Sequence, residues 1–114
     1  MNRVRNDADH ASHARNGRVL VVTSVAAARD AVLGGGRGEA RLDVLSGGGG
    51  AAAGGISTAK ALTQADTEYG LVVCAGIAGG FTERAAVGSV VVASEMLAAD
   101  LGAETPDGFL SVDE

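Results

Sequence analysis

The stretch Arg18-Val19-Leu20-Val21-Val22-Thr23 decides the fold class of this chain of 114 residues. Its apolar, mostly β-branched residues follow one another without polar alternation, which is typical of a strand that is covered on both faces. Strands of this kind belong to parallel sheets, because the crossover helices of such sheets pack on both faces. The sequence therefore predicts an α/β domain built on a mostly parallel sheet.

The residues after this strand predict an alternation of helices and strands. The expected elements are a helix over 26–33 ended by Gly34–Gly36, a strand over 41–46, a helix over 51–62, strands over 70–75 and 89–93, and a tight turn at 106–108. In the second helix, Ile56, Ala59 and Leu62 recur at helical spacing and are expected to pack on the sheet. Glycines follow the strands at Ser46 and Ala75, where ligands of open parallel sheets usually bind.

Composition indicates which residues form the core, and charge argues against a nucleic-acid partner. Apolar residues make up 46% of the chain and aromatic residues 3%, so the core is expected to consist of Val, Leu, Ile and Ala. The formal net charge is −5, and all nine Lys and Arg precede residue 85. A nucleic-acid surface would gather basic side chains on one face, so no nucleic-acid partner is expected.

Residues 1–17 are polar and are expected to form a disordered leader. They lack the apolar stretch of a secretory signal. Apolar runs are too short to span a bilayer, so no membrane partner is expected. His10 and His13 have no further ligand nearby, and no metal site is predicted. The single cysteine, Cys74, fits a reducing, cytoplasmic location and is expected to be a buried, unreactive thiol.

Three segments carry a resemblance to a known family: AGIAGGF at 75–81, VGSVVVASE at 87–95 and AADLGAETPDGF at 98–109. In this order they resemble the futalosine hydrolases, within the superfamily of purine nucleoside phosphorylases and methylthioadenosine nucleosidases. The last segment is the most particular to futalosine hydrolases. The resemblance implies a phosphorylase/hydrolase-like three-layer α/β fold with a mostly parallel central sheet. Family members are longer, so residues 18–114 are expected to be the N-terminal portion of such a domain, and the fold to be truncated.

The resemblance also implies an activity. Futalosine hydrolases cleave the N-glycosidic bond of futalosine with water, releasing hypoxanthine and dehypoxanthinyl futalosine in menaquinone biosynthesis. The substrate is a purine nucleoside, no metal or organic cofactor is needed, and two copies pair as a homodimer. Three alternatives stay open: a methylthioadenosine or adenosylhomocysteine nucleosidase, a purine nucleoside phosphorylase, and a catalytically inactive fragment that lacks the C-terminal catalytic half.

The expected substrate-binding residues fall at the ends of strands. By resemblance, the glycine loop is where phosphorylases bind phosphate and hydrolases bind the attacking water, and the turn after residue 75 runs beside the ribose and the base. Thr23 is expected at the edge of the same pocket. The full set is Thr23, Gly47, Gly48, Gly49, Gly76, Ile77, Ala78 and Gly79.

One position departs from the family pattern. Where the family has a glutamate that activates the water, this chain has Ala28, which cannot accept a proton. Asp30 is nearby, but its offset along a helix would direct its carboxylate elsewhere. The catalytic acid of the family has no counterpart in these 114 residues, so no catalytic residue is predicted.

Overall fold

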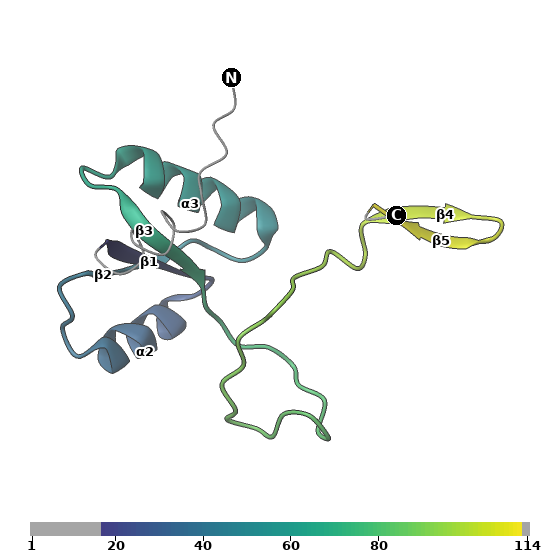
Figure 1. Ribbon diagram of the computed structural model, residues 1–114, viewed down its shortest axis with the longest axis horizontal. Coiled ribbons are helices and arrows are strands. Elements are labelled where there is room, and N and C mark those ends of the chain that lie inside the picture. Colours follow the sequence, from purple (N-terminus) through teal and green to yellow (C-terminus); the bar gives the residue numbers. More distant parts are fainter. Residues whose placement is uncertain (1–16, 113–114) are drawn as a thin grey trace. The chain divides into compact units, whose positions relative to one another are not determined.

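The computed structural model describes residues 17–112. The chain divides into two compact units, the first ending at Ala78 and the second beginning at Gly79. The first unit holds a three-stranded sheet with two helices, and the second holds a β-hairpin (Figure 1). The predicted leader lies outside the described residues, apart from Gly17, and so do His10 and His13.

Strand β1 (Arg18–Thr23) is the centre of the first unit. It pairs in parallel with β2 (Leu42–Ser46) on one side and with β3 (Tyr69–Cys74) on the other, giving the order β2-β1-β3. Leu20, Val21 and Val22 are buried, as the uninterrupted apolar pattern of this strand predicted. The predicted α/β class with a parallel sheet is therefore confirmed.

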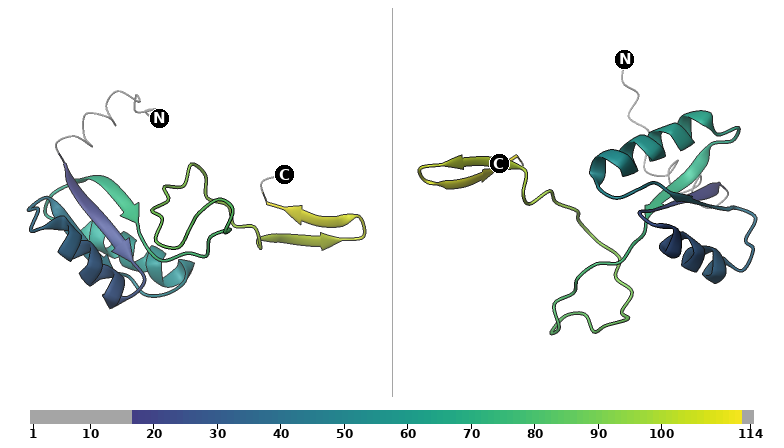
Figure 2. Two further views of the ribbon diagram at one scale, coloured as in Figure 1. Left: turned by 90° about the horizontal axis from the view of Figure 1, so that it is seen from below. Right: turned by 180° about the vertical axis from the view of Figure 1, so that it is seen from behind.

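Helix α2 (Ala26–Gly36) connects β1 to β2, and α3 (Ala51–Gln64) connects β2 to β3. The two helices lie on opposite faces of the sheet, so the first unit has three layers (Figures 1 and 2). The first crossover leads from β1 to β2 on one side, and the second leads from β2 back across β1 to β3 on the other side, so the strand order reverses at β1. This reversal is the place where open α/β sheets usually bind ligands.

Helix α2 continues through the three glycines that were expected to end it. Arg37, with a φ of 50°, forms the left-handed C-cap instead. A Cβ on Gly36 would lie 2.6 Å from Cδ2 of Leu42, so glycine at this position allows the end of the helix to approach β2.

Helix α3 packs on the sheet through a different face from the predicted one. Ile56 is 71% exposed and Leu62 is 43% exposed, so these two do not form its inner stripe. The half-buried positions of α3 are small residues spaced three or four positions apart: Ala53, Gly54, Ser57, Thr58 and Ala61. Small side chains let the helix backbone approach the sheet, and this close approach outweighs the larger apolar area that Ile56 could bury.

Cys74 is exposed, which corrects the expectation of a buried thiol. It lies at the end of β3, an edge strand, and Leu71 and Val72 in the same strand are also 46% and 42% exposed. The apolar sequence of β3 predicted the strand correctly. The burial that it also predicted is wrong, because burial requires a neighbouring element that no other part of the described first unit supplies.

In the second unit, β4 (Gly102–Thr105) pairs antiparallel with β5 (Gly108–Ser111) around a turn at Pro106 and Asp107. The predicted turn is confirmed, whereas the two strands beside it were not predicted. Residues 89–93, expected to form a strand, have no regular structure because no described segment pairs with them. Phe81 in the same unit is 83% exposed.

Candidate functional site

The carboxyl ends of the three parallel strands meet at one edge of the sheet, which we call the carboxyl edge: Thr23, Ser46–Gly50 and Cys74–Ala78. Two backbone hydrogen bonds fix its geometry. The Gly47 N–H donates to the Thr23 carbonyl at 2.8 Å, and the Ala75 N–H donates to the Val22 carbonyl at 2.9 Å. Both bonds continue the pairing of the sheet past the ends of β2 and β3, so the two glycine segments begin on either side of β1.

Thr23 supports this edge from inside. Its side chain is 2% exposed, and its hydroxyl lies 3.2 Å from the carbonyl of Leu45 and 3.3 Å from that of Val25. One hydroxyl hydrogen is thus shared between the end of β2 and the N-cap of α2. Thr23 braces the edge from inside, and its place beside a ligand stays a prediction.

The glycine loop after β2 leads from a buried residue to an exposed helix start. Gly47 is buried, whereas Gly48, Gly49 and Gly50 are exposed. Gly48 has a φ of 89° and Gly50 a φ of 85°, conformations that side chains disfavour. Gly50 is the N-cap of α3 and makes no side-chain cap, so the first N–H groups of the helix are open to an anion or to a polar ligand atom.

The segment after β3 is open. Ile77 is 96% exposed, and a Cβ on Gly76 would meet no atom within 4 Å. Ala78 is the last residue of the first unit, and Gly79 belongs to the second. The structure therefore brings Thr23, the glycine loop and the start of the 76–78 segment to one edge, and it does not join Gly79 to them.

Ala28 is in the first turn of α2 and is half-buried. Its methyl group cannot take up a proton. Asp30 is exposed and accepts hydrogen bonds from the neighbouring Arg29 at 2.9 and 3.0 Å, which occupies its carboxylate at the surface.

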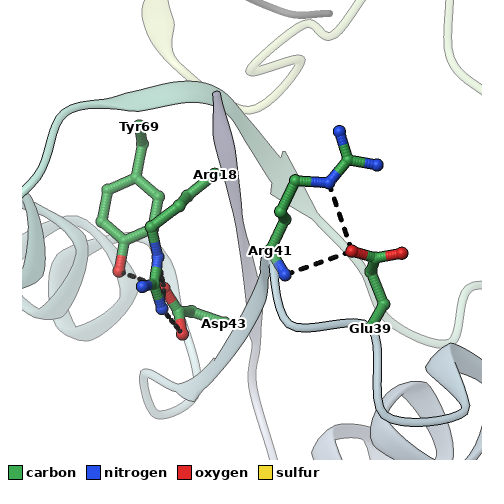
Figure 3. A network of polar contacts seen from close by, with 5 residues as sticks. All are labelled: Arg18, Glu39, Arg41, Asp43 and Tyr69. Atoms are coloured by element: carbon green, nitrogen blue, oxygen red, sulfur yellow. Dashed lines mark hydrogen bonds and ion pairs between the residues drawn. The ribbon is translucent and has the colours of Figure 1, made fainter. Parts of the chain in front are cut away.

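The opposite edge of the sheet carries a polar cluster that the sequence did not predict, the amino-edge cluster of Arg18, Asp43 and Tyr69 (Figure 3). Arg18 donates to both carboxylate oxygens of Asp43, at 2.5 to 2.9 Å, and the Tyr69 hydroxyl donates to Asp43 at 2.8 Å. Each member comes from a different strand, so the cluster fastens all three. The sequence could have indicated this cluster, because a charged or phenolic residue stands first or second in each of the three strands.

The ionisation of this cluster points to a structural role. The hydrogen bond from Arg18 lowers the pKa of Asp43, and the hydrogen bond to Asp43 raises the pKa of Tyr69. Both shifts move the pKa values further from pH 7. A general acid or base works best with a pKa near the working pH. A cavity of about 250 Å³ lies beside the cluster and is lined by its three members together with residues 64–67. A second ion pair, Glu39 with Arg41, lies nearby; hydrogen bonding to Arg41 lowers the pKa of Glu39 (Figure 3).

Within residues 17–112, no His, Cys, Asp or Glu side chains are grouped in a way that could hold a metal ion. None of the described helices has the length and hydropathy needed to cross a membrane.

Two curated proteins show which known proteins this chain is similar to. A futalosine hydrolase of Acidothermus cellulolyticus is 42% identical over 107 residues, which cover 82% of this chain and 43% of the relative. The chain is similar to futalosine hydrolases. A second futalosine hydrolase, from Streptomyces coelicolor, is 68% identical over 44 residues, covering 39% of this chain and 19% of that protein. The chain thus matches less than half the length of either futalosine hydrolase.

The comparisons confirm the resemblance and agree with the fold. The mixed α/β unit with its three-stranded parallel sheet is consistent with part of a phosphorylase/nucleosidase-like fold. No family model matches the chain. No solved structure matches it either.

Proposed function

We propose that this chain forms the glycine-lined part of a nucleoside site in a futalosine hydrolase-like enzyme. The observation that carries the proposal is the carboxyl edge. Two backbone bonds bring the Gly47 and Ala75 segments to either side of β1, in a chain 42% identical to a futalosine hydrolase over 82% of its length. Edges of this kind bind ligands in open α/β sheets.

The proposed reaction is the hydrolysis of the N-glycosidic bond of futalosine. The C–N bond to the purine breaks, the hydroxyl of water forms a new bond to the sugar carbon, and the proton goes to the departing hypoxanthine. Dehypoxanthinyl futalosine remains, for use in menaquinone biosynthesis. As the sugar carbon loses the purine it gains positive charge, so groups that orient water and stabilise the leaving base contribute most.

The carboxyl edge fits the positioning part of this chemistry. In the proposal, Gly48 and Gly49 approach the attacking water together with the open N–H groups at the start of α3. Gly76, Ile77 and Ala78 run along the ribose and base, where bare backbone allows close approach. We place the enzyme in the cytoplasm as a homodimer that binds a purine nucleoside.

Ala28 predicts slow turnover. If a glutamate at this place activates water in futalosine hydrolases, its absence removes a general base, which costs about 10²–10⁴ in rate. The same observation favours the second candidate, a chain that binds a nucleoside without cleaving it. Turnover itself separates the two.

The test is release of hypoxanthine from futalosine by the purified chain, with and without phosphate. Release with equal amounts of dehypoxanthinyl futalosine and no phosphate dependence is expected. Gly76→Ala adds a methyl group that meets no protein atom within 4 Å, so it should lower kcat/KM by intruding on the ligand alone. Gly35→Ala, equally free of neighbours but in α2, is the matched control.

Each other outcome rejects a part of the proposal. Hypoxanthine release only with phosphate would make the chain a phosphorylase. Binding of futalosine without release would support the non-cleaving candidate. Equal kcat/KM for Gly76→Ala and Gly35→Ala would remove the segment after β3 from the site.

A further inference from the structure

The glycine loop is held in place by a side chain outside the predicted site. Ser57, in the second turn of α3, donates a hydrogen bond from its Oγ to the carbonyl oxygen of Gly47 at 2.9 Å. On its other side, the N–H of Gly47 donates to the Thr23 carbonyl at 2.8 Å. The peptide groups on both sides of Gly47 are therefore fixed, one by β1 and one by α3.

Packing fixes the same residue. A Cβ on Gly47 would lie 3.2 Å from Cγ1 of Val22 and 3.4 Å from Cβ of Ser57, so the backbone of Gly47 fills a narrow space between β1 and α3. Ser57 belongs to the small-residue face of α3 that packs toward the sheet. Since Gly47 is buried, water is a poor substitute for the Ser57 hydroxyl if that donor is removed.

Beyond Gly47, the one close approach is at Gly48, where a Cβ would lie 3.2 Å from the Cβ of Ala53. A Cβ on Gly49 or on Gly50 would meet nothing within 4 Å, and the regular bonding of α3 begins with the Gly54 N–H on the Gly50 carbonyl. Gly48–Gly50 thus form a three-residue arch between two anchors, Gly47 and the start of α3. The Ser57 bond sets the direction in which the chain leaves the first anchor.

From this geometry we propose that Ser57 is a positioning residue for the candidate site. It acts through Gly47 and fixes the orientation of the Gly48–Gly50 arch; it does not contact the substrate. This role rests on the proposed function, because the arch is the part of the site assigned to the attacking water. Neither the glycine motif nor the resemblance pointed to Ser57, since the bond spans ten residues of sequence.

The neighbouring Thr58 offers a matched control. Its hydroxyl donates to the Gly54 carbonyl at 2.7 Å, so its bond stays within α3 and does not reach the loop. Ser57→Ala and Thr58→Ala each remove one half-buried hydroxyl from adjacent positions of the same helix. Ser57→Thr keeps the hydroxyl and is the rescue variant. Ser57→Cys keeps the shape with a weak donor, and replaces Ser57→Ala if that variant does not fold.

The first experiment measures amide hydrogen exchange and ¹⁵N relaxation of the glycines at 48–50 in the full chain, without substrate. Ser57→Ala is expected to speed exchange by about tenfold and to lower the order parameters of the arch, while Thr58→Ala and Ser57→Thr resemble the wild type. Unchanged exchange in Ser57→Ala, or an equal change in Thr58→Ala, would overturn the positioning role.

The second experiment measures hypoxanthine release. Ser57→Ala should lower kcat severalfold with a smaller change in KM, because a misdirected arch affects the oriented water more than substrate binding. If Ser57→Ala speeds exchange in the arch but leaves kcat unchanged, the catalytic part of the inference is overturned. If the wild type releases no hypoxanthine, the proposed function fails, and the exchange experiment alone decides whether Ser57 positions the loop.

Discussion

Two adjacent glycines are expected to respond to the same substitution with opposite signs. Gly48 has a φ of 89°, and a Cβ there would lie 3.2 Å from the Cβ of Ala53. Gly49 has no positive φ, and a Cβ there would meet nothing within 4 Å. A methyl group is therefore strained and crowded at the first position and free at the second.

The magnitudes follow from these two environments. A side chain forced into a left-handed conformation costs about 1–2 kcal/mol, so Gly48→Ala should lower the free energy of unfolding by at least that amount. Gly49→Ala restricts the unfolded chain without straining the folded one, and should raise the free energy of unfolding by about 0.4–1 kcal/mol. The two variants should thus differ by about 1.5–3 kcal/mol.

Urea unfolding followed by far-ultraviolet circular dichroism measures this difference, with equal m-values as the condition for comparing midpoints. Melting temperatures should rank in the same order, with about 4–8 °C for each kcal/mol in a domain of this size. If Gly48→Ala proves as stable as Gly49→Ala, the loop does not hold a positive φ at Gly48 in solution, and the arch between Gly47 and α3 has another shape.

Three further predictions concern acid stability, turnover and solubility. Asp43→Asn should destabilise the chain at pH 7, and its deficit in the free energy of unfolding should shrink as the pH falls below about 4, measured by urea unfolding across that range. The sign follows because Arg18 lowers the pKa of Asp43: the stabilisation is complete above the unfolded pKa and is lost as the pH falls through the folded one. Ala28→Glu, with Ala28→Gln as control, should raise hypoxanthine release by about 10² or more, and an equal rate for both would exclude this position as the base. Val90 and Val92 are 92% and 90% exposed, so we expect chains to associate through these apolar side chains. Replacing both with Lys should therefore reduce light scattering at equal concentration, and unchanged scattering would refute this.

The core of the fold could be predicted because its signals are local. The uninterrupted apolar run of β1 predicted burial on both faces, and Leu20, Val21 and Val22 are buried. The predicted bounds of α3 and β3 were correct to within about two residues. Such signals depend on the period of apolar residues, which the sequence shows directly.

The features that were missed depend on neighbours. The inner face of α3 follows the small residues at Ala53 and Ser57, because the loop from β2 sets which side of the helix meets the sheet. Residues 89–93 have the composition of a strand, but a strand also needs a partner for its backbone groups. The β4–β5 hairpin has a clear local signal only at its turn: Pro106 and Asp107 predict the turn, whereas the four-residue segments on either side are too short to show the period of a strand.

The sequence predicted where the candidate site lies in the sheet, but it did not predict the side chains that hold the site in place. Glycines at strand ends indicated the carboxyl edge, because parallel strands end together there. The roles of Thr23 and Ser57 could not be predicted, since each depends on a carbonyl that only the folded chain brings within reach. The same holds for the amino-edge cluster, whose three members are separated by at least 25 residues.

The two edges of the sheet are held by different means, and this difference suits the nucleoside site proposed above. At the amino edge, the ion pair of Arg18 and Asp43 and the hydroxyl of Tyr69 fasten three strands, with pKa values shifted away from neutrality. At the carboxyl edge, backbone bonds and buried hydroxyls do the fastening and leave the exposed glycines bare. A charged cluster there would compete with substrate and water for the same donors. Substitutions in the amino-edge cluster should therefore change stability with little effect on kcat, whereas loss of the Ser57 hydroxyl should change kcat more than stability.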